Sequence, residues 1–435
     1  MGYIPASPGE RQAMLNEIGL SDTRALYRQV PEGLLLERLN LPDGLGEMAV
    51  SEKMRALAGR NRLFNAIFRG AGAYNHYIPA VVKSIARKEE FVTAYTPYQA
   101  EISQGLLQSI FEYQSMICEL TGMDAANASV YDGATAAAEA VSMCRDARRP
   151  AALIAQTAHP MCLETIETYA RPSGAAVRRV GEKSGRLDIG RLSGQLADAC
   201  CLYIQQPNYY GLFEDMDAIR ALTRQAGVKL IEAVNPIACA VMKTPGETGA
   251  DVCVGEGQPL GMPLSFGGPY LGFMAVNQAM KRKLPGRIVG ETRDGDNRRA
   301  FVLTLQAREQ HIRREKASSN ICSNQALCAL TAAAYMAAMG PEGLRGVAVQ
   351  SMSHAAYARG QLARLGFLPE HEGPFFHEFV TGCPLDGARL MDELAARGML
   401  GPLPLEGNRL LWCFTELNAK PQIDRLISAL EEVLK

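Results

Sequence analysis

The 435-residue chain has no long apolar run and no excess of charge of either sign. A membrane-spanning helix needs about 20 apolar residues in a row, and the segment from Met1 to Ala6 lacks the apolar core of a signal peptide. The 45 basic and 46 acidic residues give a formal charge of -1. Composition therefore favours neither nucleic acid nor a membrane as a partner, and we expect a cytoplasmic protein.

The sequence also lacks the spacing patterns of common metal and nucleophile sites. Its 11 cysteines include no CxxC pair, and several, such as Cys200, Cys201 and Cys253, lie in apolar runs that resemble strands. Buried, reduced thiols explain these cysteines better than disulfides or zinc ligands. HExxH, GxSxG and P-loop patterns are missing too. We predict no metal site.

A further absence is that of lysine between Thr244 and Met280. Residues 249–254 read as a short apolar strand, followed by a glycine-rich turn and a second glycine-rich strand at 270–276. On the commonest fold for pyridoxal phosphate, a lysine leaving such a strand holds the cofactor as an imine. Here Gln258 and Pro259 occupy that stretch, and neither side chain has an amine. The chain is therefore predicted to hold no covalently bound cofactor by itself.

The pattern of apolar residues predicts three regions. Residues 1–80 read as short helices joined by loops, with a capping box at Ser7 to Glu10, and form a helical arm. In residues 81–317 a helix at 103–120 is followed by alternating signals for strands (152–155, 201–204, 228–234, 252–254) and helices (162–170, 214–225). This alternation predicts a large α/β domain whose mostly parallel sheet is covered on both faces.

Residues 318–435 read differently. Long helices are expected at 324–339 and 341–365, then strands at 378–381 and 410–414 mixed with helices at 388–397 and 422–434. We expect a smaller C-terminal α+β domain.

Several polar segments are candidates for a binding site. The run from Tyr95 to Gly105 packs hydroxyl, amide and carboxylate groups into a loop just before a helix that Ser103 could cap, although a purely structural loop gives the same composition. The segment Asp132 to Thr135 suits either an anion or ordinary helix capping. Residues 68–77 contain a GxG pattern that favours close backbone packing over nucleotide binding.

Two residues would suit a cofactor ring. His159 follows a predicted strand and could stack on a ring, or could be a structural histidine. Glu232 lies at a strand end where cofactor enzymes of this fold have an acid against the pyridine nitrogen. Glutamate is longer than the usual aspartate.

Three longer motifs carry a family resemblance: residues 95–105, 116–140 and 308–327. They resemble the glycine cleavage system P-protein, the pyridoxal phosphate-dependent glycine decarboxylase, and the resemblance covers nearly the whole chain. The P-protein occurs as one long chain or as two half-length subunits. This sequence is similar to subunit 1, the α partner, while subunit 2 would supply the lysine. The fold implied is fold type I of pyridoxal phosphate-dependent transferases.

The resemblance implies a shared reaction. Glycine binds the cofactor on subunit 2 as an imine, carbon dioxide leaves, and the aminomethyl group passes to the lipoyl arm of the H-protein. Two αβ units would form a heterotetramer. Candidates for contributing to the shared active site from this chain are Tyr95, Thr96, Tyr98, Gln99, Glu101, Ser103, Ser318, Ser319 and Asn320. His159 and Glu232 would be vestiges of a cofactor site.

Two other hypotheses stay open from the sequence. The chain could be a non-catalytic scaffold that stabilises subunit 2. It could instead be a separate pyridoxal phosphate lyase or aminotransferase that uses another lysine, with Lys243 the nearest candidate, only 11 positions after Glu232.

Overall fold

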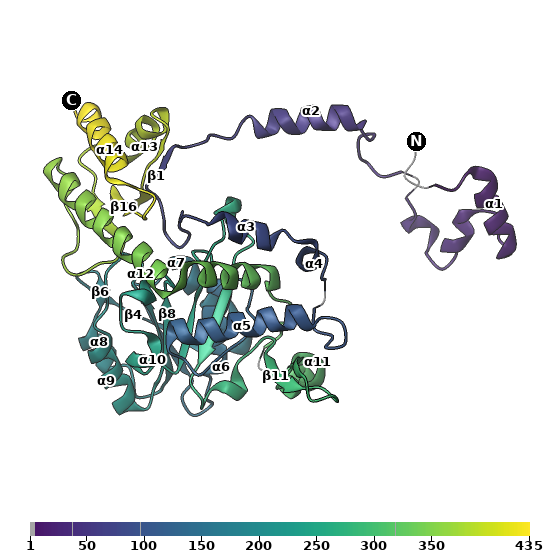
Figure 1. Ribbon diagram of the computed structural model, residues 1–435, viewed down its shortest axis with the longest axis horizontal. Coiled ribbons are helices and arrows are strands. Elements are labelled where there is room, and N and C mark those ends of the chain that lie inside the picture. Colours follow the sequence, from purple (N-terminus) through teal and green to yellow (C-terminus); the bar gives the residue numbers. More distant parts are fainter. Residues whose placement is uncertain (1–4, 37, 96, 318) are drawn as a thin grey trace. The chain divides into compact units, whose positions relative to one another are not determined.

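The computed structural model describes residues 5–36, 38–95, 97–317 and 319–435 (Figure 1). Its contacts divide the chain into two compact units, Met1–Leu63 and Phe64–Lys435. The domain boundaries predicted at residues 80 and 317 stay predictions. No helix within the described ranges combines the length and apolar character needed to cross a membrane.

The first unit consists of short helices and loops, as predicted. Helix α1 (Pro8–Glu17) begins with the expected capping box: Ser7 Oγ accepts from Glu10 N, and Glu10 Oε2 accepts from Ser7 N at 2.7 Å. Two 3-10 turns and helix α2 (Glu47–Ala58) follow. Leu15 is the one buried residue in the described part of this unit. Because it buries so little apolar surface, the unit has no core of its own.

A seven-stranded sheet forms the centre of the second unit, in the order β2-β10-β9-β8-β7-β3-β4. The strands are β2 (Ala125–Ala126), β3 (Ala151–Ala155), β4 (Ala176–Val180), β7 (Ala199–Gln206), β8 (Lys229–Val234), β9 (Val252–Glu256) and β10 (Gly272–Val276). Strand β10 runs antiparallel to both its neighbours, β2 and β9, and the other four strand pairs of this sheet are parallel. The prediction of a mostly parallel sheet is confirmed.

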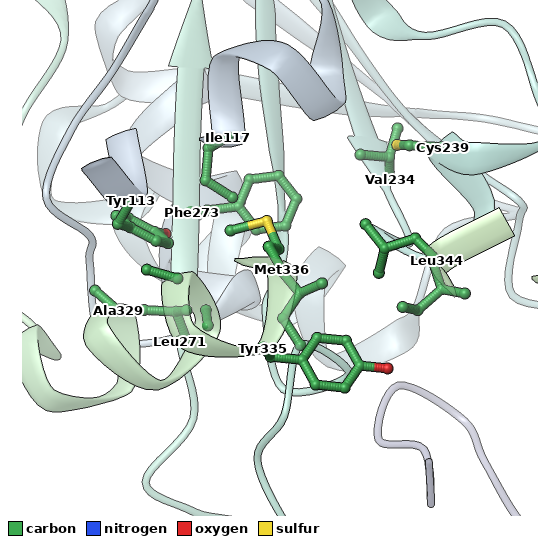
Figure 2. Packing of buried hydrophobic residues seen from close by; sticks show 14 of the residues in the cluster. Tyr113, Ile117, Val234, Cys239, Leu271, Phe273, Ala329, Tyr335, Met336 and Leu344 are labelled. Carbon is green, nitrogen blue, oxygen red and sulfur yellow. The ribbon is translucent and has the colours of Figure 1, made fainter. Parts of the chain in front are cut away.

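Helices cover both faces of this sheet because its strands are apolar on both sides. On one face lie α5 (Gln104–Thr121) and α12 (Ala326–Arg364), with α8 (Ile189–Ser193) and α9 (Met216–Ala226) beside them. Figure 2 shows part of this packing, to which Tyr113 of α5, Phe273 of β10 and Tyr335 of α12 belong. On the other face lie α6 (Gly133–Met143) and α7 (Pro160–Ala170).

Helix α12 is interrupted, as the sequence predicts from Pro341. Gly340 has φ 60° and ψ 179°, so two helical stretches meet at a kink there. Proline cannot donate to the helical ladder and its ring clashes with the preceding turn, which accounts for the break.

The C-terminal residues form a three-stranded antiparallel sheet covered by helices. The strands are β13 (Glu378–Gly382), β15 (Leu403–Leu405) and β16 (Arg409–Cys413), and the helices are α13 (Gly387–Ala396) and α14 (Lys420–Val433). Trp412, Phe379 and Phe414 pack in the core beneath them. Strand β14 (Met399–Leu400) pairs in parallel with β1 (Ala66–Ile67), which joins the start of this unit to its end.

Smaller elements complete the unit. They are α3 (Ala80–Ala86), α4 (Glu89–Val92), β5 (Glu182–Lys183), β6 (Arg186–Leu187), α10 (Pro245–Thr248), β11 (Val289–Arg293), β12 (Arg299–Leu303) and α11 (Gln310–Arg313).

Candidate functional site

The residues that would surround a cofactor gather around the carboxyl ends of the parallel strands. His159 follows β3 and Gln258 follows β9. Glu232 lies inside β8, two residues before its end, so its predicted place at a strand end is wrong: the apolar residues Ala233 and Val234 continue the strand. Ligands of open α/β sheets bind at this edge. Whether pyridoxal phosphate fits this chain can therefore be judged from these side chains and their neighbours.

Gln258, which with Pro259 occupies the stretch where a lysine was expected, is buried and fully hydrogen-bonded within the chain. Its Oε1 accepts from Tyr74 N at 2.8 Å, and its Nε2 donates to the carbonyl oxygens of Tyr74 at 2.9 Å and Met262 at 2.8 Å. The side chain is 1% exposed. Gln258 thus acts as a clamp on the backbone of Tyr74, and it has no amine with which to form an imine.

The amino end of α6, where an anion could bind, is occupied by a carboxylate of the chain itself. Asp132 caps the helix by accepting from Thr135 N at 2.7 Å. Glu256 Oε2 accepts from Gly133 N at 3.0 Å. Its Oε1 accepts from Gln258 N and Leu271 N, both at 2.9 Å. Burial raises the pKa of Glu256, and these three backbone N–H groups oppose that rise. A phosphate here would have to displace Glu256.

His159 faces backbone. Its Nε2 lies 3.0 Å from the carbonyl oxygen of Ala71, its Nδ1 accepts from Met161 N, and Tyr209 meets the ring edge-on with centroids 5.1 Å apart. A Cβ added to Gly72 would lie 3.2 Å from the His159 ring, so the segment from Gly70 to Tyr77 covers one side of it closely. Burial lowers the pKa of His159. These contacts are those of a structural histidine.

Glu232 is fully buried, and Thr248 Oγ1 donates to its Oε2 at 2.6 Å. The other oxygen, Oε1, has no hydrogen-bond partner among the described residues. Burial raises the pKa of Glu232 to about 7. Strand β8 pairs Glu232 with Cys253 of β9. With this pKa, the carboxyl group of Glu232 is protonated in a large fraction of the molecules near neutral pH. The acid that holds a protonated pyridine nitrogen must instead be ionised.

Pyridoxal phosphate does not fit this arrangement of the described residues. The stretch without a lysine holds the clamped amide of Gln258, Glu256 accepts from the first N–H of α6, and the segment from Gly70 to Tyr77 packs against His159. The ring of His159 is therefore covered by the chain's own backbone.

The segment from Gly70 to Tyr77 is held in place by two acids that the sequence analysis did not single out, the buried Glu378 and the half-buried Glu416. Glu378 accepts from Ala71 N at 2.6 Å and from the Tyr74 hydroxyl at 2.7 Å. Glu416 lies 2.7 Å from His76 Nδ1 and accepts from Tyr77 N at 2.7 Å. The one signal in the sequence was the GxG pattern: a Cβ on Gly70 would lie 2.5 Å from Glu378 Oε1. The close backbone packing predicted for this pattern is confirmed.

The loop ahead of α5 presents polar groups to solvent. Tyr95 is 95% exposed, and Gln99 and Glu101 are exposed as well. Tyr98 is held inside the chain: its hydroxyl donates to Asn324 Oδ1 at 2.8 Å, and the Arg287 guanidinium lies 5.2 Å from its ring centroid. Burial raises the pKa of Tyr98. The Thr96 prediction lies outside the described residues.

Ser103 occupies the N-cap position of α5, but its side chain makes no capping hydrogen bond. The capping prediction for Ser103 is wrong. A good N-cap residue has extended backbone geometry, whereas Ser103 has φ -118° and ψ 27°. Gln104 secures this end of the helix instead, since its amide bonds to the backbone of Ala100 and Phe301.

The segment before α12 lies next to this loop, because Asn324 bonds Tyr98. Ser319 Oγ accepts from Ile321 N at 3.0 Å, and Asn320 is exposed. The Ser318 prediction lies outside the described residues. Arg287, beside Tyr98, also lines a cavity of about 370 Å³ with Glu309, His311, Arg314 and Cys322, among others. The bond between Tyr98 and Asn324 therefore brings the two predicted segments together. The cavity lies beside them, and none of the described candidate residues lines it.

Comparison with known proteins decides the family. The family model for the glycine cleavage system P-protein matches residues 1–430. This chain belongs to the P-protein family. The family prediction made from residues 95–105, 116–140 and 308–327 is confirmed.

Individual P-proteins agree over the whole length. The chain is 47% identical to the probable glycine dehydrogenase (decarboxylating) subunit 1 of Moorella thermoacetica, with 100% of both chains covered. It is 44% identical to the protein of the same name in Chlorobium chlorochromatii, with 99% of both covered. A crystal structure of a P-protein, glycine decarboxylase of the glycine cleavage system in an inhibitor-bound form, is 40% identical and superposes with a TM-score of 0.93 over 100% of both chains.

More distant structures have the same fold. An alanine–glyoxylate aminotransferase from Nostoc is 17% identical, covers 93% of this chain and gives a TM-score of 0.62. The prediction of fold type I is confirmed.

Proposed function

We propose that this chain is subunit 1 of a two-subunit glycine decarboxylase, the P-protein of the glycine cleavage system. One observation carries the proposal: relatives named as subunit 1 match the chain from end to end. The absence of a lysine between Thr244 and Met280 agrees with it. The enzyme acts on glycine, and this chain acts with a lysine-bearing subunit 2.

The two subunits divide the work. Pyridoxal phosphate, bound covalently by subunit 2, would supply the ring system that takes up electrons as the carboxylate of glycine leaves. The aminomethyl group would then pass to the lipoyl arm of the H-protein. Two αβ units form the assembly. Hydrogen bonds within the chain support this division. Glu256 accepts from the backbone N–H groups of Gly133 and Gln258, and Gln258 Nε2 donates to the carbonyl oxygen of Met262, so both side chains have hydrogen-bond partners without a ligand.

The contribution of this chain is the loop ahead of α5. Tyr95, Gln99 and Glu101 are exposed there. The exposed ring of Tyr95 does not stabilise the isolated chain. Tyr98 fixes the loop to Asn324 and to the segment that contains Ser319 and Asn320. The exposed polar groups would bind and orient groups in the site on subunit 2, and Thr96 and Ser318 belong to the same proposal.

The contacts of Lys243 weigh against a self-sufficient enzyme. Its Nζ lies 2.8 and 2.7 Å from the two carboxylate oxygens of Asp217, and this ion pair raises the pKa of Lys243. A lysine must lose its proton to attack an aldehyde. Lys243 is thus held in the unreactive form at the surface.

Reconstitution tests the proposal. The chain and subunit 2 are purified separately, and glycine-dependent release of labelled carbon dioxide is measured for each alone and for the mixture, with lipoylated H-protein present. We expect activity only in the mixture, and activity of this chain alone would contradict the proposal. If subunit 2 alone reaches the full rate once its fold is stabilised by other means, the chain is a scaffold.

A further inference from the structure

The loop between Gln258 and β10 presents an aromatic ring to solvent in a costly backbone conformation. Phe266 is 99% exposed, more than any other large apolar residue in the described part of the chain. Phe266 has φ 54° and its predecessor Ser265 has φ 43°, in the left-handed region that side chains other than glycine rarely adopt. Both the exposure and the conformation are unfavourable in the isolated chain.

The loop is anchored at its base, so the ring is held out by a rigid support. The hydroxyl of Tyr270 donates to the carbonyl oxygen of Leu264 at 2.7 Å. Met262 and Leu271, on either side of the loop, belong to the buried cluster that contains Val82 of α3 and Cys328 of α12. Around Gly267 there is open space, because an added Cβ would meet no atom within 4 Å.

The first turns of α12 connect this loop with the loop ahead of α5. Cys328 Sγ lies 3.9 Å from the carbonyl oxygen of Pro269, three residues after Phe266. Asn324, four residues before Cys328, accepts from the hydroxyl of Tyr98. The segment of residues 324–328 is short, so the Phe266 loop and the Tyr95 to Gln104 loop border the same part of the molecule.

We propose that Phe266 is an anchor of the interface with the lysine-bearing partner subunit, inserting its ring into an apolar pocket of that subunit beside the shared site. This inference rests on the proposed function. The continuity with the Tyr98 loop points to this partner, because the proposed function assigns that loop to the site on subunit 2. A buried aromatic ring near the centre of an interface commonly contributes much of its affinity, and the unfavourable loop conformation is offset only when the partner covers it.

Two variants separate docking from backbone effects. Phe266→Gly removes the ring and relieves the left-handed conformation, whereas Phe266→Ser removes the ring and keeps a non-glycine backbone. We expect both to weaken association with subunit 2 by about 10-fold or more, as for loss of a buried interface aromatic. The isolated Phe266→Gly chain should melt at the same temperature as the natural chain or higher.

The measurement is the dissociation constant of the heteromer, by sedimentation at several concentrations, with calorimetric melting of the isolated chain. Leu368→Ser is the matched control, since Leu368 is also an exposed apolar residue, 63% exposed, and it should leave affinity within about twofold. Unchanged affinity in both Phe266 variants would overturn the inference. So would an effect confined to self-association of this chain. If the natural chain itself fails to associate with subunit 2, the proposed function fails, which is a different result.

Discussion

The hydrogen bonds of Gln258 to Tyr74 and Met262 allow a prediction of how much this side chain stabilises the segment around Tyr74. In Gln258→Met the side chain keeps similar volume but loses all three hydrogen bonds, leaving Tyr74 N, Tyr74 O and Met262 O without partners in a buried setting. Each unpaired buried group costs about 1–3 kcal/mol. Since methionine recovers part of this through apolar packing, we expect a loss of about 3 kcal/mol.

The loss should be local, because the clamp ties Tyr74 to the sheet. Hydrogen exchange followed by mass spectrometry measures the opening of peptides that cover residues 69–77. A local loss of about 3 kcal/mol corresponds to roughly 100-fold faster exchange. Gln278→Met is the control, since Gln278 is exposed and its substitution should change exchange little. Unchanged exchange at residues 69–77 in Gln258→Met would refute the clamp.

Three further predictions concern the loop and the buried acids. Tyr95→Phe should leave assembly and melting unchanged and lower glycine decarboxylation by about 10-fold or more. It is a cleaner test than Tyr98→Phe, which also loses the bond to Asn324; full turnover in both would make the loop structural. Burial raises the pKa of Glu232 to about 7. Between its ordinary pKa and pH 7, Glu232 is therefore protonated in the folded chain and ionised in the unfolded chain. Its contribution to stability is therefore complete at low pH and is lost as the pH rises through about 7. Urea unfolding measures the free energy of unfolding of Glu232→Gln relative to that of the natural chain, and this difference should shift in favour of the variant by about 2–3 kcal/mol between pH 5 and pH 8. A difference that stays constant with pH, as expected for the exposed Glu406→Gln, would contradict the assignment. Glu256→Gln places an amide donor against one or more backbone N–H groups and should lower the urea midpoint at pH 8. An unchanged midpoint would mean that the carboxylate of Glu256 is not needed at the start of α6.

The strands and helices were predictable because their signals are local. The apolar run at 228–234 became β8, and the interruption between 339 and 341 became the kink of α12. Ser103 shows the limit, since the residue type suits a cap but the backbone does not adopt the required geometry. A capping prediction needs the dihedral angles as well as the sequence.

The sequence allowed us to predict that the site lacks a lysine, but not which side chains of the chain occupy it. Gln258 has no amine, which the sequence reveals directly. Its clamp on Tyr74 joins residues 184 positions apart, and the bond from Gly133 to Glu256 spans 123 positions. No local pattern marks such pairs, because the tertiary fold brings them together. For the same reason the sequence could suggest an anion at the start of α6 but could not indicate that Glu256 takes its place.

Chemical trapping of the cofactor tests the central claim most directly. This chain, subunit 2 and their mixture are each incubated with pyridoxal phosphate, reduced with borohydride and mapped by mass spectrometry. We predict labelling of one lysine of subunit 2 and no specific lysine of this chain, alone or in the mixture. Stoichiometric labelling of Lys243, Lys281 or any other single lysine of this chain would contradict the account.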